Sequence, residues 1–286
     1  MRKKHQHIIP QVYLRQFGFT KFRNEWFVSV KNQKNGKWED REVRRFLVGK
    51  EFYTLSVYRN ISDLILENDL NGKIENRLPK IIDYLNYIAS GDKIHRAIHM
   101  DIAETTANFL CRSELVINWL KGWYTRSDVR FFFDMITDGQ FEGEISNDHI
   151  FNVTMSFQEK DKTLTLMVFL MQHIKLILCN AKMTIFRNQS DFHLLTSNNP
   201  VNLVNVGIGD LPNPNMEIYF PLSKDYLIYF YWDSSITIVE TIKPILQNDT
   251  VHDLNEDLYT HFTLNILASF ADKFIILPTD KSNLGR

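Results

Sequence analysis

Tyr226-Leu227-Ile228-Tyr229-Phe230-Tyr231 is an uninterrupted run of apolar and aromatic residues in the C-terminal part of the chain. A strand with one face in water alternates polar and apolar side chains, whereas a short continuous run suits a strand covered on both faces. We therefore expect residues 226–231 to form a central strand of a sheet. Weaker strand patterns occupy residues 183–186, 192–196 and 273–277, and residues 256–270 have the pattern of a helix.

The chain before this run has a different periodicity. Between residues 60 and 180 the apolar residues recur every three or four positions, as they do along one face of an α-helix. Ile74, Leu78 and Ile81 belong to one such face, and Pro79 lies inside the pattern, so that helix starts or kinks there. The other helices are expected over residues 93–123, 127–138, 147–157 and 162–179.

The N-terminal region is predicted to be extended. Residues 26–30 have a strand pattern, and Asn35-Gly36 is a strong hairpin signal. Residues 37–47 form a weaker, highly charged second strand that suits a sheet edge. Strands at both ends with helices between them predict an α+β fold. In it, a mixed or antiparallel sheet built from the N- and C-terminal segments packs on a central helical layer.

We expect the chain to form a single compact domain over residues 1–286. Within it, residues 1–58 would be an extended or hairpin arm and residues 60–180 a helical subdomain. Residues 182–286 would supply the remaining strands and a C-terminal helix. A chain of this length can bury a sizeable hydrophobic core.

Composition limits the class of protein. The net charge is −1, from 33 basic and 34 acidic residues, which argues against a nucleic-acid coat protein because such proteins are clearly basic. A small basic cleft is compatible with this balance, since net charge says little about local fields. Cys111 and Cys179 are too few for a disulfide framework or a four-cysteine zinc site, and we expect both to be buried.

The sequence shows neither a signal peptide nor a segment long and apolar enough to cross a membrane. Met1-Arg2-Lys3-Lys4 resembles the start of a signal peptide, but no apolar segment follows it. The most apolar stretch, residues 166–179, is too short for a bilayer and contains Gln172 and Lys175. We therefore expect a cytoplasmic protein without a membrane partner.

The segment His7-Ile8-Ile9-Pro10-Gln11-Val12-Tyr13-Leu14-Arg15-Gln16-Phe17 combines apolar anchors with polar heads. Pro10 is well placed as the first residue of a short helix. Histidine exchanges protons near neutral pH, and arginine holds carboxylates or phosphates with two hydrogen bonds. These residue types suit a functional site at His7 and Arg15. They equally suit a docked N-terminal arm whose polar groups are satisfied.

Arg112 lies at the edge of the apolar face of the helix expected over residues 93–123. A buried arginine needs an acid, a carbonyl or an anion as its partner. The alternatives are an ion pair within the helical layer and a clamp for an anionic ligand. On the same helix His95 and His99 have a spacing that can chelate a metal. Arg96 stands beside them, where a dication is unfavourable, so we expect an exposed helix face and no metal.

Thr196-Ser197-Asn198-Asn199-Pro200 follows a predicted strand, where both functional side chains and ordinary turns occur. Ser197 lacks a neighbouring G-x-S-x-G elbow, so a hydrolase triad is poorly supported. Glu75 and Tyr53 are further polar residues that could converge on a site. The sequence has no glycine-rich phosphate loop, CxxC pair or EF-hand loop, so no cofactor is expected.

Taken in order, these elements resemble a mainly bacterial group, domain-of-unknown-function family 4238. The opening segment is similar to the family's His-aromatic-Val/Ile-Pro-x-x-Tyr-Leu-Arg/Lys-x-Phe motif. The other elements that resemble family motifs are Phe52-Tyr53, Ile74-Glu75, Phe109-Leu110-Cys111-Arg112, Thr196-Ser197-Asn198-Asn199-Pro200-Val201 and Phe220-Pro221-Leu222-Ser223. Asn198 departs from the pattern, because the family usually has Asp there. If that Asp were a metal ligand or general base, this chain would be impaired.

The resemblance implies that the scattered polar residues share one site. The leading hypothesis is a hydrolase acting on a phosphodiester or nucleotide, such as a nuclease-like effector of a defence or toxin system. His7 would be the general acid or base, Arg15 and Arg112 would hold the phosphate, and Glu75 would exchange protons with His7. The residues expected to bind substrate are Gln11, Tyr13, Tyr53, Ser197 and Asn199.

Two other hypotheses use the same residues. The protein would be a sensing module that binds an anionic ligand such as a nucleotide without chemistry. Alternatively, it would be a protein-interaction scaffold in which the polar set forms a core network. A nucleic acid or nucleotide is the expected partner under the first two hypotheses.

Overall fold

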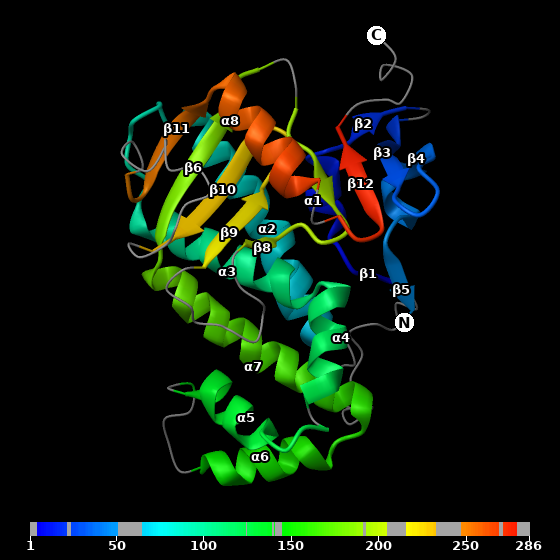
Figure 1. Cartoon of the computed structure of the whole chain (residues 1–286), viewed down its shortest axis with the longest axis vertical. Coiled ribbons are helices and arrows are strands. Elements are labelled where there is room, and N and C mark those ends of the chain that lie inside the picture. The colour runs from blue at the N-terminus through cyan, green and yellow to red at the C-terminus, as the bar shows by residue number, and fades with distance from the viewer. Residues whose placement is uncertain are drawn as a thin grey trace.

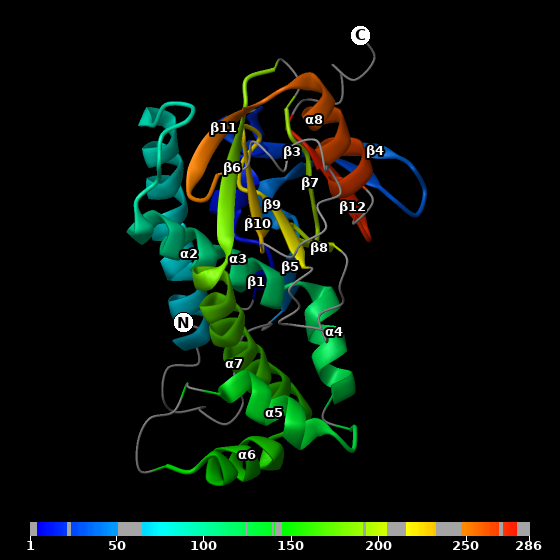
Figure 2. The same cartoon turned by 60° about the vertical axis from the view of Figure 1, so that its left-hand side comes forward.

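The computed structural model describes residues 5–21, 24–50, 65–123, 125–138, 140, 145–190, 193–204, 216–232, 247–268 and 271–278. It confirms the α+β fold class. Figures 1 and 2 show the strands gathered at one end of the molecule, with α3 and α7 beneath them and α5 and α6 at the opposite end.

One five-stranded sheet is formed entirely by C-terminal strands, in the order β11-β6-β10-β9-β8. All neighbours in it are antiparallel except β11, which pairs parallel to β6 at the edge. The central strand β10 spans Tyr226–Tyr231, which confirms the prediction from its apolar run. The other strands are β6 (Lys182–Asn188), β8 (Asn202–Val204), β9 (Glu217–Pro221) and β11 (Thr250–Leu254).

A second sheet joins the two ends of the chain, as expected. Strand β12 (Phe274–Leu277) lies between β3 (Trp26–Asn32) and β7 (Thr196–Ser197). Strand β3 also pairs with β2 (Phe19–Thr20) and β4 (Trp38–Glu42). The predicted strand over residues 37–47 is thus shorter, because a 3-10 turn over Val43–Arg45 ends it. A separate short pair joins β1 (His5–His7) to β5 (Val48–Lys50).

Alternate side chains of β10 enter two different cores. Ile228 and Phe230 pack with the helical layer, whereas Leu227 and Tyr229 pack on the opposite face, beneath the C-terminal helices. The helical layer consists of α2 (Ile65–Tyr87), α3 (Arg96–Cys111), α4 (Glu114–Trp123), α5 (Val129–Thr137), α6 (Asn147–Ser156) and α7 (Glu159–Asn180). The opposite face is covered by α8 (Glu256–Thr260) and a π-helix over His261–Leu267.

The structure corrects the single helix predicted over residues 93–123. Two helices, α3 and α4, meet at Arg112 and Ser113. The Ser113 hydroxyl accepts a hydrogen bond from the Val116 backbone N–H at 3.3 Å, so it caps the start of α4. The break could not be read from the apolar periodicity, which continues across it. By contrast, α2 continues through Pro79 instead of starting there.

Helix α7 is longer than expected from the apolar stretch over residues 166–179, which alone is too short for a bilayer. It is 22 residues long and is the one helix among the described residues that is long and apolar enough to cross a membrane. Within the fold it packs along α3 and buries Leu166, Met167 and Leu170, so it is a core helix of this domain. The cytoplasmic location stays a prediction.

Candidate functional site

Tyr13 anchors the N-terminal arm in the core. It lies in the short helix α1 (Gln11–Arg15), whose N-cap is Pro10, and its side chain is 0% exposed. Its hydroxyl contacts the Pro221 carbonyl oxygen and Thr196 Oγ1, each at 2.7 Å. The phenol has one proton and a carbonyl can only accept, so Tyr13 donates to Pro221 and Thr196 donates to Tyr13. Burial raises the pKa of the Tyr13 phenol far above its ordinary value, which keeps it a neutral donor.

Arg112 holds the chain just before α1. Its guanidinium donates from Nη2 to the His7 carbonyl oxygen at 2.8 Å and from Nη1 to Asn108 Oδ1 at 3.3 Å. Arg112 is buried, with only 2% of its surface exposed. A backbone carbonyl of the arm is therefore one partner of this buried arginine, a possibility that the sequence left open. Its position ties the end of α3 to strand β1.

The turn after β7 holds the C-terminal strand in place. Asn198 Oδ1 accepts hydrogen bonds from the backbone N–H groups of Lys273 and Phe274 at 2.9 and 3.0 Å. The Ser197 hydroxyl donates to the Asn199 carbonyl and accepts from the Asn199 N–H, at 2.8 and 3.0 Å. An aspartate has the same Oδ1 acceptor as Asn198. The departure from the family pattern therefore preserves the contact that this residue makes.

The motif segments meet, as the shared-site hypothesis expected, but they meet in the core. The Tyr13 ring lies against Phe109 and Phe220, with ring centroids 4.6 and 5.7 Å away. Its hydroxyl contacts Pro221, next to Phe220, and Thr196 of one further motif segment. Four stretches that are far apart in sequence are thus joined through one tyrosine.

The outer face of the arm carries a line of polar side chains. The Gln11 amide nitrogen donates to His7 Nε2 at 2.8 Å, and the Gln11 carbonyl oxygen accepts from Arg15 Nη2 at 3.4 Å. Gln11 and Arg15 are four residues apart and so lie on one side of α1. His7 Nε2 is the acceptor in this arrangement, which leaves any ring proton of the neutral form on Nδ1.

Gln11 and Arg15 line an open pocket of about 200 Å³. The wall opposite them comes from the start of β3 and the end of β4. Glu42 forms ion pairs with Arg44, whose Nε lies 2.9 Å away, and with Arg45, whose Nε lies 3.1 Å away, so two guanidinium groups offset its charge. The full lining is Gln11, Arg15, Asn24, Glu25, Trp26, Glu42, Val43 and Arg44.

The other predicted site residues lie away from this pocket. Glu75 is exposed on α2, and no described residue forms a hydrogen bond or ion pair with it. Tyr13, Arg112, Ser197 and Asn199 are buried at the junction beneath the arm. Tyr53 lies outside the described residues. The catalytic and substrate-binding roles assigned to these residues stay predictions.

Trp26 and Arg44 line this pocket but were not predicted as site residues. Trp26 was part of a strand pattern, and Arg44 was one of many charges on a predicted edge strand. Only the pairing of β3 with β4 places them opposite α1. The adjacent Arg44-Arg45 pair was the one available signal, because it concentrates positive charge near a turn.

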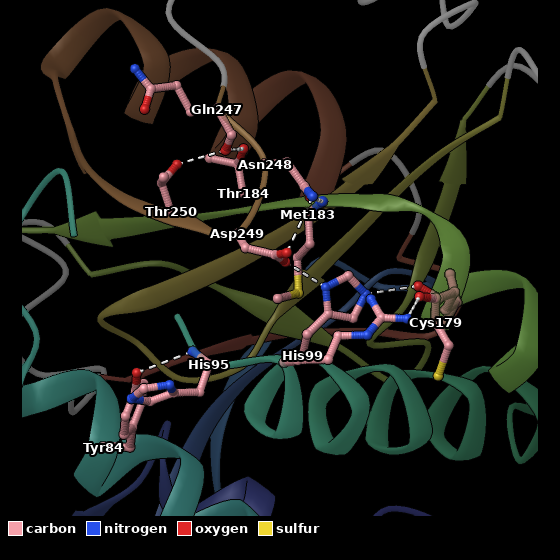
Figure 3. Close-up of polar contacts among 12 residues, drawn as sticks. Tyr84, His95, His99, Cys179, Met183, Thr184, Gln247, Asn248, Asp249 and Thr250 are labelled. Atoms are coloured by element: carbon pink, nitrogen blue, oxygen red, sulfur yellow. Dashed lines mark hydrogen bonds and ion pairs between the residues drawn. The ribbon is translucent and has the colours of Figure 1, made fainter. Parts of the chain in front are cut away.

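The predicted exposure of both His95 and His99 is wrong for His99. His95 is exposed, as predicted, but His99 is 0% exposed and contacts Asp249, as Figure 3 shows. The helix carrying them therefore does not present both histidines to solvent. Among the described residues, no group of three or more His, Cys, Asp or Glu side chains is arranged to hold a metal ion.

A second buried polar group lies beneath the π-helix. Glu217 is 0% exposed, and it accepts a hydrogen bond from the Tyr219 hydroxyl at 2.6 Å. Tyr219 stacks on Tyr229 of the central strand at 4.8 Å between ring centroids. Burial raises the pKa of both phenols, so they stay protonated beside the carboxyl group.

The fold and the arm define an α+β protein whose N-terminal segment is locked into its core and presents one polar face to a pocket. The chain belongs to the family described as Protein of unknown function (DUF4238), whose model matches residues 5–281. No curated protein and no solved structure matches the chain.

Removal of the Tyr13 hydroxyl tests the junction. Tyr13→Phe keeps the ring but leaves the Pro221 carbonyl without its donor, so we expect a loss of about 1–3 kcal/mol in the free energy of unfolding. Urea denaturation would measure it. Tyr87→Phe is the matched control, because Tyr87 is 91% exposed and should change stability by less than about 0.5 kcal/mol. Equal stability of both variants would show that the Tyr13 hydrogen bonds contribute nothing.

Two substitutions at one position separate acceptor chemistry from charge. Asn198→Asp retains Oδ1 and should unfold within about 1 kcal/mol of the parent at neutral pH, since charge-assisted bonds offset the burial of the carboxylate. Asn198→Leu leaves two backbone N–H groups without an acceptor, at a cost of about 1–3 kcal/mol each. Thermal unfolding would compare the three proteins. A large loss in the Asp variant would contradict a role based on the oxygen acceptor.

Proposed function

We propose that the pocket beside α1 binds an anionic small molecule, and that this molecule is a nucleotide. The observation that carries the proposal is that Gln11 and Arg15 of the opening segment line one open pocket together with Arg44 and Trp26. The protein would then act as a ligand-sensing module. The net charge of −1 favours a single small anion over a long nucleic acid, which needs an extended basic surface.

The two arginines supply the anion-binding groups. Arg15 is exposed, and among the described residues its one hydrogen-bond partner is Gln11 at 3.4 Å. Arg44 is also exposed, and its Nε forms an ion pair with Glu42 at 2.9 Å. A guanidinium held in this way can bind a phosphate with two parallel hydrogen bonds.

Trp26 and Glu25 favour a nucleotide over inorganic phosphate. Trp26 is 36% exposed on the pocket wall, and an indole face can stack on a base. Glu25 is exposed beside it, and its carboxylate can accept from ribose hydroxyls or a base amino group. A nucleotide offers an anion, an aromatic ring and such donors in one molecule.

Hydrolysis of the bound ligand is the second candidate function. One contact favours it: His7 Nε2 accepts from Gln11, so an imidazole lies directly behind a pocket residue. Arg112 supports this arrangement by holding the His7 carbonyl, which makes it a positioning residue in this proposal. A nuclease-type reaction would use His7 as general acid or base and Arg15 to hold the phosphate.

Removing either pocket arginine tests the binding proposal. Isothermal titration with AMP, GMP, CMP, UMP and inorganic phosphate would identify a binding nucleotide. Arg15→Gln and Arg44→Gln should then each raise its Kd about 10- to 100-fold, because a hydrogen bond to a charged group contributes about 1.5–3 kcal/mol. Both side chains are exposed, so the Tm should stay unchanged.

Arg41→Gln is the matched control for this titration, because Arg41 is exposed on β4, pairs with Glu39 and does not line the pocket. Absence of binding by all five probes at millimolar concentration would contradict the proposal. Equal effects of the pocket and control substitutions would do the same. Chromatography of the titrated nucleotide after prolonged incubation separates binding from hydrolysis, and His7→Gln should abolish any product formed.

A further inference from the structure

His99 is enclosed between the helical layer and the sheet that contains β6, β10 and β11. Figure 3 shows its ring between Asp249, at the start of β11, and the C-terminal end of α7. Nδ1 lies 2.5 Å from Asp249 Oδ1, and Nε2 lies 3.0 Å from the Leu178 carbonyl oxygen. The ring also packs edge-on against Phe230 of the central strand, at 5.9 Å between centroids. Both ring nitrogens therefore have close oxygen partners.

These contacts determine the protonation state of the ring. A backbone carbonyl can only accept a hydrogen bond, and an ionised carboxylate can only accept as well. Both bonds exist together only if both ring nitrogens carry protons, so the bonded ring is an imidazolium cation. A neutral ring would lose one of the two bonds and leave a buried acceptor without a donor.

Asp249 connects this cation to the backbone of β6 and of the segment just before α3. It has a positive φ of 56°, a conformation that Asp and Asn adopt more readily than other side chains. Its N–H donates to the Met183 carbonyl at 2.7 Å, and its carbonyl accepts from the Ile94 N–H at 2.8 Å. The preceding Asn248 accepts from the Met183 N–H through Oδ1 at 2.9 Å. The entrance to β11 is thus fixed to β6 and to the start of α3.

We propose that His99 and Asp249 form a proton-dependent clamp, which holds the start of edge strand β11 against the helical layer when His99 is protonated. Strand β11 is the last strand of its sheet and pairs with β6 alone among the described strands. The clamp and the backbone bonds at Asp249 hold its first residues. Loss of the imidazolium proton removes the charge pairing and one hydrogen bond, so this end of the strand opens more often.

The other charged groups around the pair have partners of their own. On α3, Arg96 donates to the Cys179 carbonyl, and on α7, Lys175 pairs with Glu104 at 2.8 Å. His95 is exposed one turn before His99. In the loop before α3, the Asp92 carboxylate accepts from the Ala89 N–H. On β11, His252 Nε2 contacts Thr250 Oγ1 at 2.9 Å. Asp249 is therefore the carboxylate that His99 directly bonds.

Proton linkage gives the sign of the pH dependence. Both hydrogen bonds of the clamp need a proton on each ring nitrogen of His99. The stability that the clamp contributes is therefore present at lower pH and decreases as pH rises. His252 contributes in the opposite direction, since burial lowers its pKa. A difference between two variants cancels that contribution.

Asp249→Asn isolates the proton dependence. Asparagine tolerates the positive φ and has the same shape, and its amide can donate to a neutral His99 Nδ1 while Nε2 still donates to Leu178. The bonds then no longer require an imidazolium. We expect the parent Tm to exceed the variant Tm by roughly 5–10 °C near pH 6 and by less than half of that near pH 9.

His149→Gln is the matched control, because His149 is an exposed histidine on α6. Its Tm difference from the parent should stay below about 2 °C and constant over the same range. A pH-independent difference between the parent and Asp249→Asn would overturn the proton-dependent clamp.

Amide hydrogen exchange tests the location of the opening. After correction for intrinsic exchange, the Asp249 and Val251 amides of the parent should lose about 10-fold protection from pH 6 to pH 9, whereas those of Asp249→Asn should not. These amides donate to the Met183 and Asp92 carbonyls. An equal loss of protection across β10 would mean global destabilisation and would overturn a local clamp. Unchanged protection at Asp249 and Val251 would also overturn it.

Discussion

The hydroxyl of Tyr13 is the contact on which the arrangement of the chain ends depends. It joins residues separated by 183 and 208 positions in the sequence, donating to Pro221 and accepting from Thr196. Both partners are buried and have few alternatives, so loss of this bond leaves a polar group without compensation in the core. The ring supplies the apolar contacts to Phe109 and Phe220 that make the hydroxyl inaccessible to water. Packing and hydrogen bonding at Tyr13 therefore both stabilise the attachment of the N-terminal arm to the C-terminal strands.

The attachment of the arm to the core also determines which of its side chains are exposed to solvent. Helix α1 has five residues, too few to be stable alone, so its conformation depends on burial of Tyr13, Leu14 and the following Phe17. Once that face is buried, Gln11 and Arg15 must lie on the opposite side. The pocket thus follows from the core contacts. The sequence motif therefore contains two kinds of residue: those that attach the arm to the core, and those that line the pocket.

Periodicity in the sequence predicted the elements whose neighbours are apolar. The unbroken run at residues 226–231 identified the central strand, and the helices over residues 127–138 and 147–157 match α5 and α6 within two residues at each end. Polar contacts between distant segments were not predictable in this way. His99 is buried because Asp249, 150 residues away, supplies its partner. Arg112 is buried where it bonds a backbone carbonyl of the arm. Every residue has such a carbonyl, so the pattern of side chains could not identify this partner.

Asn198 shows how a motif position can be separated from a catalytic role. A residue that accepts two backbone N–H groups needs only an oxygen at Oδ1, which Asn and Asp share. A general base needs the carboxylate charge, which Asn lacks. The exchange at this position is therefore compatible with the fold and would be incompatible with acid–base chemistry there. By the same reasoning, binding chemistry belongs to residues such as Arg15 and Arg44, whose donors the fold leaves facing a pocket.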